Sequence, residues 1–408
     1  MGGARLLGGV LAATFGVAAA CGEAVAPVPA SPTLKFCPTV ALPTWFAYQN
    51  EGQPWVQLPA GTASFSFEPA RRLTIAYATD NPSGAGGGAT VWIASVTAEE
   101  LNDFQCPFPR GDRRLTGSVM NWQVADEFVA LAMGPQAKTA EPESPTFVFS
   151  TLSDAPIDLV AEVASTPRRI VIRRDVMANS GTTLPPLDIA SSEVKPTAQF
   201  IVNLEPADAP RVTRSYYFLT ANGTAFHFVD GLSLGTPNQS VPHEMTRSGD
   251  VHAVSFLSGV SPEPTRYVAN FFRQTSDRTL TLGALLGLPT FDVVSATPYL
   301  RLHMTLASQP EYSTFVHARY VQATPNGGTV SVHVLVSAAY VGRTPAAWDV
   351  SIPDLTSAPG FDVNWMLKSG FPSDWTVEAS SGLPFWRSTR PKDGLTVRTA
   401  TRQSTLAP

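Results

Sequence analysis

The chain has 408 residues, a formal net charge of −5 and only 15% charged residues. This length suits two or three domains of ordinary size, and the lack of a basic stripe argues against nucleic acid as a partner. The 36 prolines favour short strands joined by turns, because proline lacks the N–H that a helix needs.

Residues 1–20 have the organisation of an export signal. Arg5 and the amino terminus supply positive charge, and the stretch from Leu6 to Ala20 is uncharged, apolar and ends in small residues. This stretch is too short to span a bilayer, and no later stretch reaches the ~18 apolar residues of a transmembrane helix. The pattern predicts a signal peptide at 1–20 and an exported protein.

The four residues Ala18-Ala19-Ala20-Cys21 resemble the lipobox of bacterial lipoproteins, in which small residues precede a cysteine that receives diacylglycerol on its thiol. Ala18 stands where leucine is usual, and the same alanines fit the cleavage site of an ordinary secreted protein. The resemblance implies a lipid on Cys21 and a membrane partner at the outer membrane or cell surface. The alternative is secretion without a lipid.

Cysteine number favours the lipid. The chain has three cysteines, and an odd thiol is a liability in an oxidising compartment. Acylation of Cys21 would leave Cys37 and Cys106, which we expect to form a disulfide. The small residues and prolines that follow Cys21 predict a flexible tether over 21–36.

Alternating apolar residues dominate the rest of the chain and predict strands, because successive side chains of a strand point to opposite faces. One such pattern places Val330, Val332, Val334 and Val336 on one face. Further strands are expected in 62–69, 71–80, 89–96 and 168–176. Helix signals are sparse. Thr97 and Glu100 form the pattern of a capping box, which predicts one short helix.

Residues 115–163 resemble the carboxypeptidase regulatory-like, or transthyretin-like, β-sandwich. The pattern is a G-x-V strand, a V-x-L strand, an F-x-F-x-x-L segment and a closing L-x-A strand. The matching residues are Gly117, Val119, Val129, Leu131, Phe147, Phe149, Leu152, Leu159 and Ala161. The family usually has a glycine before the last strand, where this chain has Ala155-Pro156. The resemblance implies a small non-catalytic sandwich and no catalytic residues.

Two patterns that could carry chemistry favour structural interpretations. Gly231-Leu232-Ser233-Leu234-Gly235 matches the G-x-S-x-G elbow of hydrolases, but prolines follow where the elbow needs a helix, so a glycine turn is expected. His317 and His333 flank Asn326-Gly327-Gly328. A three-residue hairpin loop there would place His317 opposite Ser337 and the two histidines about 13 Å apart at 3.3 Å per residue, too far to share a metal.

Four of the eight tryptophans lie near the C-terminus: Trp348, Trp365, Trp375 and Trp386. Exposed on a β-surface, they could stack on sugar rings. The alternative is that they belong to the core, since each ring buries a large apolar area.

These observations predict an all-β protein built from two or more sandwich-like domains with antiparallel sheets, with a β-propeller as the alternative. The expected domains are an N-terminal β-domain (37–112), the regulatory-like sandwich (113–200) and a C-terminal β-region of one or two sandwiches (201–408). The expected function is non-enzymatic binding, or a structural role, at the cell envelope, with a protein or a polysaccharide as partner. No metal or cofactor is expected. The alternatives are an extracellular hydrolase that uses Ser233 or scattered acids, and a carbohydrate-binding surface protein.

Overall fold

The computed structural model describes residues 33–35, 43–59, 64–66, 72–80, 88–102, 110–123, 126–152, 155–177, 181–205, 212–324, 327–382 and 391–407. Most of these residues lie in strands of several sheets, so the predicted all-β class is confirmed. The helices are α1 (Ala98–Asn102), α2 (Ala338–Val341) and the 3-10 turns η1 (His243–Met245), η2 (Pro310–Tyr312) and η3 (Val363–Trp365). Within the described ranges no helix is long and apolar enough to cross a membrane.

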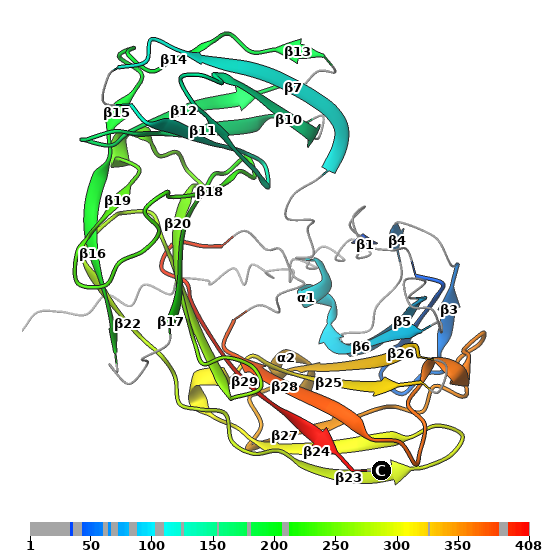
Figure 1. Ribbon diagram of the computed structural model, residues 1–408. Helices are drawn as coiled ribbons and strands as arrows, with labels where there is room; N and C mark the ends of the chain where they lie inside the picture. Colours follow the sequence, from blue (N-terminus) through cyan, green and yellow to red (C-terminus); the bar gives the residue numbers. More distant parts are fainter. Residues whose placement is uncertain are drawn as a thin grey trace, which may run out of the picture.

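One sheet of twelve strands runs through much of the molecule (Figure 1). Its strands in spatial order are β18 (Ala225–His227), β17 (Val212–Leu219), β20 (Val251–Ser258), β21 (Thr265–Phe272), β29 (Thr396–Leu406), β28 (Ser373–Ser380), β25 (Phe315–Ala323), β26 (Thr329–Ser337), β6 (Ala89–Thr97), β5 (Arg72–Asp80), β2 (Trp45–Asn50) and β3 (Val56–Leu58). A propeller would repeat four-stranded blades, whereas the described sheets hold from two to twelve strands.

Four strands from the first part of the chain join the long sheet. Strand β6 pairs in parallel with β26, and through β6 the strands β5, β2 and β3 extend the sheet that the C-terminal strands form. Trp45 and Val91 share a core with Val332 and Trp348. The strands that we expected to form a separate N-terminal domain (37–112) therefore share a core with strands near the C-terminus. Strand β1 (Thr33–Lys35), within the expected tether, pairs with β4 (Ser64–Ser66).

Two sheets from residues 110–196 pack face to face as a β-sandwich. One sheet joins β10 (Thr146–Leu152), β7 (Arg110–Met120), β13 (Thr182–Thr183) and β14 (Leu187–Asp188). The other joins β15 (Lys195–Pro196), β12 (Arg169–Val176), β11 (Ile157–Ala164), β8 (Phe128–Met133) and β9 (Gln136–Ala140). The apolar side chains of the matching pattern whose burial is described fill the core between them: Val119, Val129, Leu131, Phe147, Phe149, Leu159 and Ala161.

Strand β11 is buried along its whole length, because the sandwich packs on the rest of the molecule with its second face. Ala132, Val160 and Ile170 on that face join a core formed with β17, β20 and β21 of the long sheet. The same core contains β16 (Ala198–Glu205), which pairs with β19 (Pro237–Ser240) and β22 (Arg278–Thr281).

The other end of the long sheet is covered by a three-stranded sheet of β23 (Thr290–Ser295), β24 (Arg301–Ala307) and β27 (Ala347–Ser351). Leu302, Met304 and Trp348 of this sheet share the largest core with Val316 and Val332 of the long sheet. The region after residue 201 therefore contains two sandwich-like cores that share one continuous sheet.

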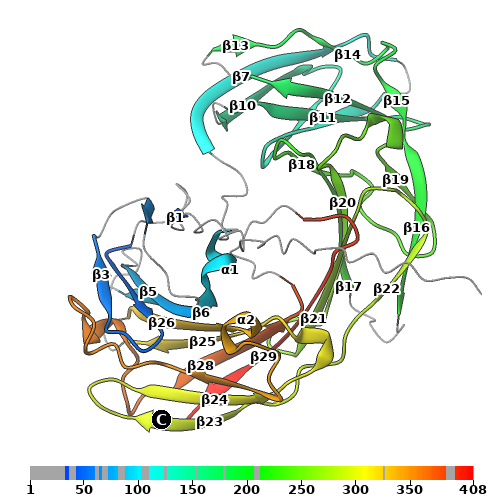
Figure 2. The same ribbon diagram turned by 180° about the vertical axis from the view of Figure 1, so that it is seen from behind.

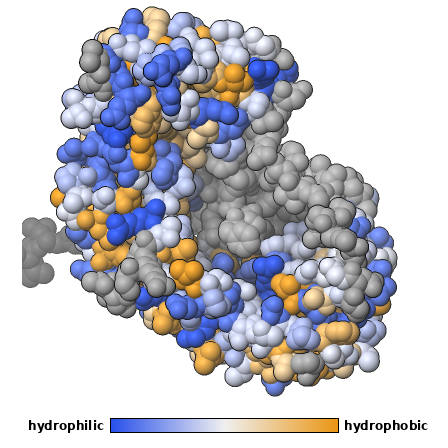
Figure 3. Space-filling view, in the orientation of Figure 1, coloured by the Kyte–Doolittle hydropathy of each residue, from blue (hydrophilic) through white to orange (hydrophobic). Residues whose placement is uncertain are grey.

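The molecule is curved, with the 110–196 sandwich at one end and strands β5 and β3 at the other, while β23, β24 and β27 lie on the outer side of the curve (Figures 1 and 2). Helix α1 lies inside this curve. In the space-filling view, hydrophobic residues are scattered among hydrophilic ones on the face shown (Figure 3).

The predicted capping box is confirmed at α1. The Thr97 N–H donates to Glu100 Oε2 at 2.8 Å, and the Glu100 N–H donates to Thr97 Oγ1 at 3.3 Å. These two bonds satisfy N–H groups that the first turn of a helix would otherwise leave unpaired.

Candidate functional site

A row of stacked rings crosses the long sheet on the face opposite its largest core. Strand register places Phe46 beside Tyr77, and it places Trp92 between Tyr77 and His333. Successive ring planes are inclined by 12°, 14° and 18°, and the centroids of Trp92 and His333 are 3.8 Å apart. His317 ends the row, 5.2 Å from His333. We call these five residues the ring ladder.

A chain of hydrogen bonds begins at the histidine end of the ladder. His317 Nε2 and His333 Nδ1 are 3.1 Å apart, and His333 Nε2 is 3.0 Å from Ser331 Oγ. Ser331 Oγ also accepts a hydrogen bond of 3.4 Å from Arg319 Nε. The four side chains share one face because each strand contributes two residues that are two positions apart.

Burial keeps both imidazoles neutral. Desolvation, followed by the charge of Arg319, lowers the pKa of His317 from 6.5 to about 4. Desolvation, followed by His317 and Arg319, lowers the pKa of His333 from 6.5 to about 2. At neutral pH each ring therefore carries one proton, which it can donate along the hydrogen-bonded chain.

Glu378 lies opposite His317 on the neighbouring strand β28. Burial raises the pKa of Glu378 from 4.5 to about 7, so a proton leaves this carboxyl near neutral pH. One of the two neutral imidazoles therefore lies on the strand next to that of an acid whose pKa is close to neutral pH.

The predicted distance between His317 and His333 is wrong. The hairpin loop spans residues 324–328, five residues instead of three, because Ala323 pairs with Thr329. This register places His317 opposite Leu335 instead of Ser337 and brings it diagonally next to His333. Ser331 and both histidines share one polar face of the hairpin.

The order serine, histidine, histidine resembles the nucleophile, base and orienting residue of a serine hydrolase. Two features oppose that chemistry. A ring with a pKa of about 2 is a poor acceptor for the serine proton at neutral pH. Strand β26 is also paired on both sides, so the N–H groups near Ser331 point along the sheet and do not converge as an oxyanion hole.

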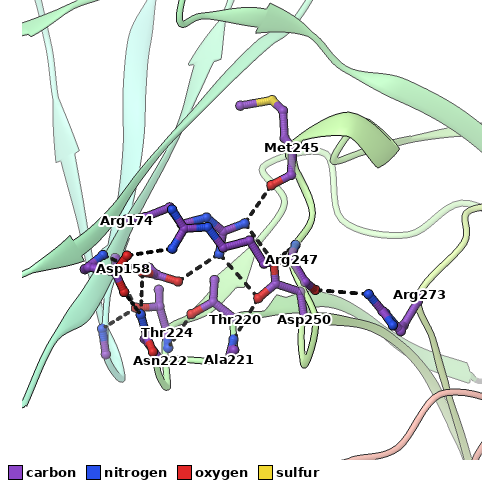
Figure 4. A network of polar contacts seen from close by, with 12 residues as sticks. Asp158, Arg174, Thr220, Ala221, Asn222, Thr224, Met245, Arg247, Asp250 and Arg273 are labelled. Atoms are coloured by element: carbon purple, nitrogen blue, oxygen red, sulfur yellow. Dashed lines mark hydrogen bonds and ion pairs between the residues drawn. The ribbon is translucent and has the colours of Figure 1, made fainter.

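A second polar cluster joins the sandwich to the long sheet (Figure 4). Arg174 of β12 donates to Asp158 Oδ2 at 2.8 Å, to Asp250 Oδ2 at 2.7 Å and to the Met245 carbonyl at 2.7 Å. Asp158 also accepts from Asn222 at 3.0 Å. The Arg174 side chain is 9% exposed and its two carboxylate partners at most 1%. This cluster satisfies buried charges across a packed junction, which is a structural role.

The predicted lipidation and disulfide residues, Cys21, Cys37 and Cys106, lie outside the described residues. The acylation of Cys21 and the pairing of the other two cysteines remain predictions.

The three C-terminal tryptophans that the structure describes belong to the largest core or pack against it. Trp348 and Trp375 are 1% and 7% exposed and belong to the largest core, and Trp365 packs against the same core. Rings buried to this degree offer no free face to a sugar, so the core alternative accounts for them. Trp386 lies outside the described residues.

Ser233 lies in a turn between β18 and β19. Gly231 and Gly235 adopt positive φ angles of 65° and 69°. The Ser233 N–H donates to Asn238 Oδ1 at 2.6 Å, and Asn238 Nδ2 donates to the Ser233 carbonyl at 2.9 Å. The segment that follows is a strand, so the helix of a nucleophile elbow is not formed here.

The sequence pattern did not reveal the ring ladder, although two of the expected strands, 71–80 and 89–96, each carried one aromatic residue of it. Register across non-neighbouring segments decides whether such rings meet. Among the side chains that the structure describes, no group of three or more His, Cys, Asp or Glu residues is placed to hold a metal ion.

The chain matches no protein-family model and no curated protein.

Proposed function

We propose that the chain is an exported lipoprotein of the bacterial cell envelope, anchored by a lipid on Cys21, with a non-enzymatic binding role. The apolar segment near the N-terminus and the small residues before Cys21 support export and attachment to the cell envelope. The several packed sheets support a rigid body that a lipid can hold at a membrane surface.

One observation carries the non-enzymatic part of the proposal. Among the described residues, Ser331, His333 and His317 are arranged most like a hydrolase site, and there the pKa of His333 is lowered to about 2. A base this weak takes up the serine proton poorly at neutral pH, because catalysis favours a pKa near the working pH. The same hydrogen bonds satisfy polar groups that are buried, and this structural role explains them without catalysis.

The rival function is an extracellular hydrolase, and the hydrogen-bonded order of these three residues is the observation that favours it. A fluorophosphonate probe, which labels activated serines, decides between the two. We expect no labelling of the purified full chain at pH 7 to 8, and no difference between it and the Ser331→Ala and Ser233→Ala variants. Labelling that disappears in either variant would establish the rival function.

A further inference from the structure

A polar cavity of about 470 Å³ lies at the edge of the junction between the sandwich and the rest of the molecule. Its walls are the β11–β12 turn, the start of β16, the strand β19 and the segment that precedes β19. The volume falls within the roughly 300–1,000 Å³ of small-molecule sites.

Two amide side chains face each other in the wall. Gln199 of β16 and Gln239 of β19 are direct partners in the strand register, and both line the cavity. Thr197 Oγ1 donates to Gln239 Oε1, which orients the amide and leaves the Nε2 donors of Gln239 available. Within the part of the chain that the structure describes, Gln199 and the Glu127 carboxylate make no side-chain hydrogen bond.

A buried acid pairs with Arg168, one of the charged residues that line the cavity. Glu162 is fully buried on the junction face of β11, where it accepts a hydrogen bond of 3.0 Å from the Val229 N–H. Arg168 lies 3.7 Å from Glu162 and also contacts Asp230. The charged side chains that line the cavity are Arg168, Asp230 and Glu127, so two carboxylates stand against one guanidinium and the wall carries a net negative charge that repels anions.

We propose that this cavity binds an uncharged saccharide unit. A sugar hydroxyl both donates and accepts, and the wall offers amide donors beside amide and carboxylate acceptors. Pro167 lines the same cavity and provides an apolar contact for the C–H groups of a sugar ring. The inference rests on the proposed binding function and assigns it a site and a ligand class.

The test is a glycan array followed by calorimetry on the purified full chain. The array carries uncharged oligosaccharides, saccharides with uronic acid or phosphate groups, and saccharides with free amines. We expect binding to uncharged oligosaccharides and none to the acidic ones. Gln239→Ala should weaken the measured affinity about tenfold, because one or two hydrogen bonds to the ligand are lost. Gln199→Ala should weaken it similarly.

Gln274→Ala is the matched control, since Gln274 is an exposed glutamine remote in sequence from the cavity segments. This variant should bind as the unchanged chain does, and all variants should melt at the same temperature. The proposal is overturned if no uncharged oligosaccharide binds, if only acidic or amine-bearing saccharides bind, or if Gln239→Ala and Gln199→Ala bind as tightly as Gln274→Ala. Such a failure would leave the lipid anchor and the absence of serine reactivity intact, because separate measurements test those.

Discussion

Two buried carboxylates meet Arg174 at the junction between the sandwich and the long sheet. Asp158 and Asp250 are almost completely buried, and Arg174 contacts both. Removing the guanidinium would leave two charges without compensation in a place that water does not reach. We therefore expect Arg174→Ala to lower the free energy of unfolding by about 3–5 kcal/mol, measured by chemical denaturation.

Arg247→Ala is the control for that experiment. Arg247 pairs with Asp175 near the same cluster, but both side chains are more than half exposed. Exposed ion pairs contribute little to stability. The stability of Arg247→Ala should match that of the unchanged chain. A similar decrease in the free energy of unfolding of both variants would show that burial does not make the Arg174 ion pairs more important than the exposed pair.

The two histidines of the ring ladder provide a prediction of pH dependence. Burial holds the pKa of His317 at about 4 and that of His333 at about 2, below the 6.5 of an unfolded histidine. Between pH 6.5 and about 4 these two histidines therefore bind more protons in the unfolded chain than in the native one, and their contribution to the free energy of unfolding falls as the pH falls.

Nitrogen NMR of the imidazole rings measures these states directly. Both rings should remain neutral in the native protein from pH 8 down to pH 5. A ring that titrates near pH 6.5 in the folded protein would contradict the account, because it would mean that water reaches the hydrogen-bonded chain.

At the scale of single elements, local pattern predicted well where local chemistry decides the structure. The Thr97–Glu100 capping box and the valine face of β26 follow from neighbouring residues alone. The β25–β26 register does not follow from neighbouring residues alone, because the length of the loop decides which residues of the two strands face each other. An error of two residues at the turn separated His317 from His333 in the prediction, although they are hydrogen-bonded in the structure.

Gly117 shows the physical reason for a glycine in the regulatory-like pattern. A Cβ at this position of β7 would lie 2.3 Å from Cζ of Phe147, whose ring is buried in the sandwich core. The ring cannot move away without disturbing that core. Gly117→Ala should therefore destabilise the protein by about 1–3 kcal/mol, measured by thermal or chemical unfolding.

A double variant and a matched control make this test specific. Shortening the ring in Gly117→Ala with Phe147→Leu should recover part of the loss. Gly287→Ala adds the same methyl group where the nearest atom is 3.9 Å away, and it should have little effect. If Gly117→Ala is as stable as Gly287→Ala, the close approach of Phe147 is not what requires the glycine.

At the scale of the whole molecule, the sequence predicted the all-β class but not the long sheet. The parallel pairing of β6 with β26 joins segments more than two hundred residues apart in the chain. No local pattern specifies such a partner, since any strand with alternating apolar residues could pair with β26 at that edge. The cavity with Gln199 and Gln239 has the same origin, because it exists only where the sandwich packs on β16 and β19.

The proposed location of the molecule depends on Cys21, which directly follows the apolar stretch from Leu6 to Ala20. Mass spectrometry of the mature N-terminal peptide, from full-length protein produced in a bacterial host, tests the central claim most directly. The account predicts a peptide that begins at Cys21 and carries the added mass of a diacylglyceryl group, and it predicts that Cys21→Ala abolishes this modification. A mature chain that begins elsewhere, or that begins at an unmodified Cys21, would contradict the lipid anchor.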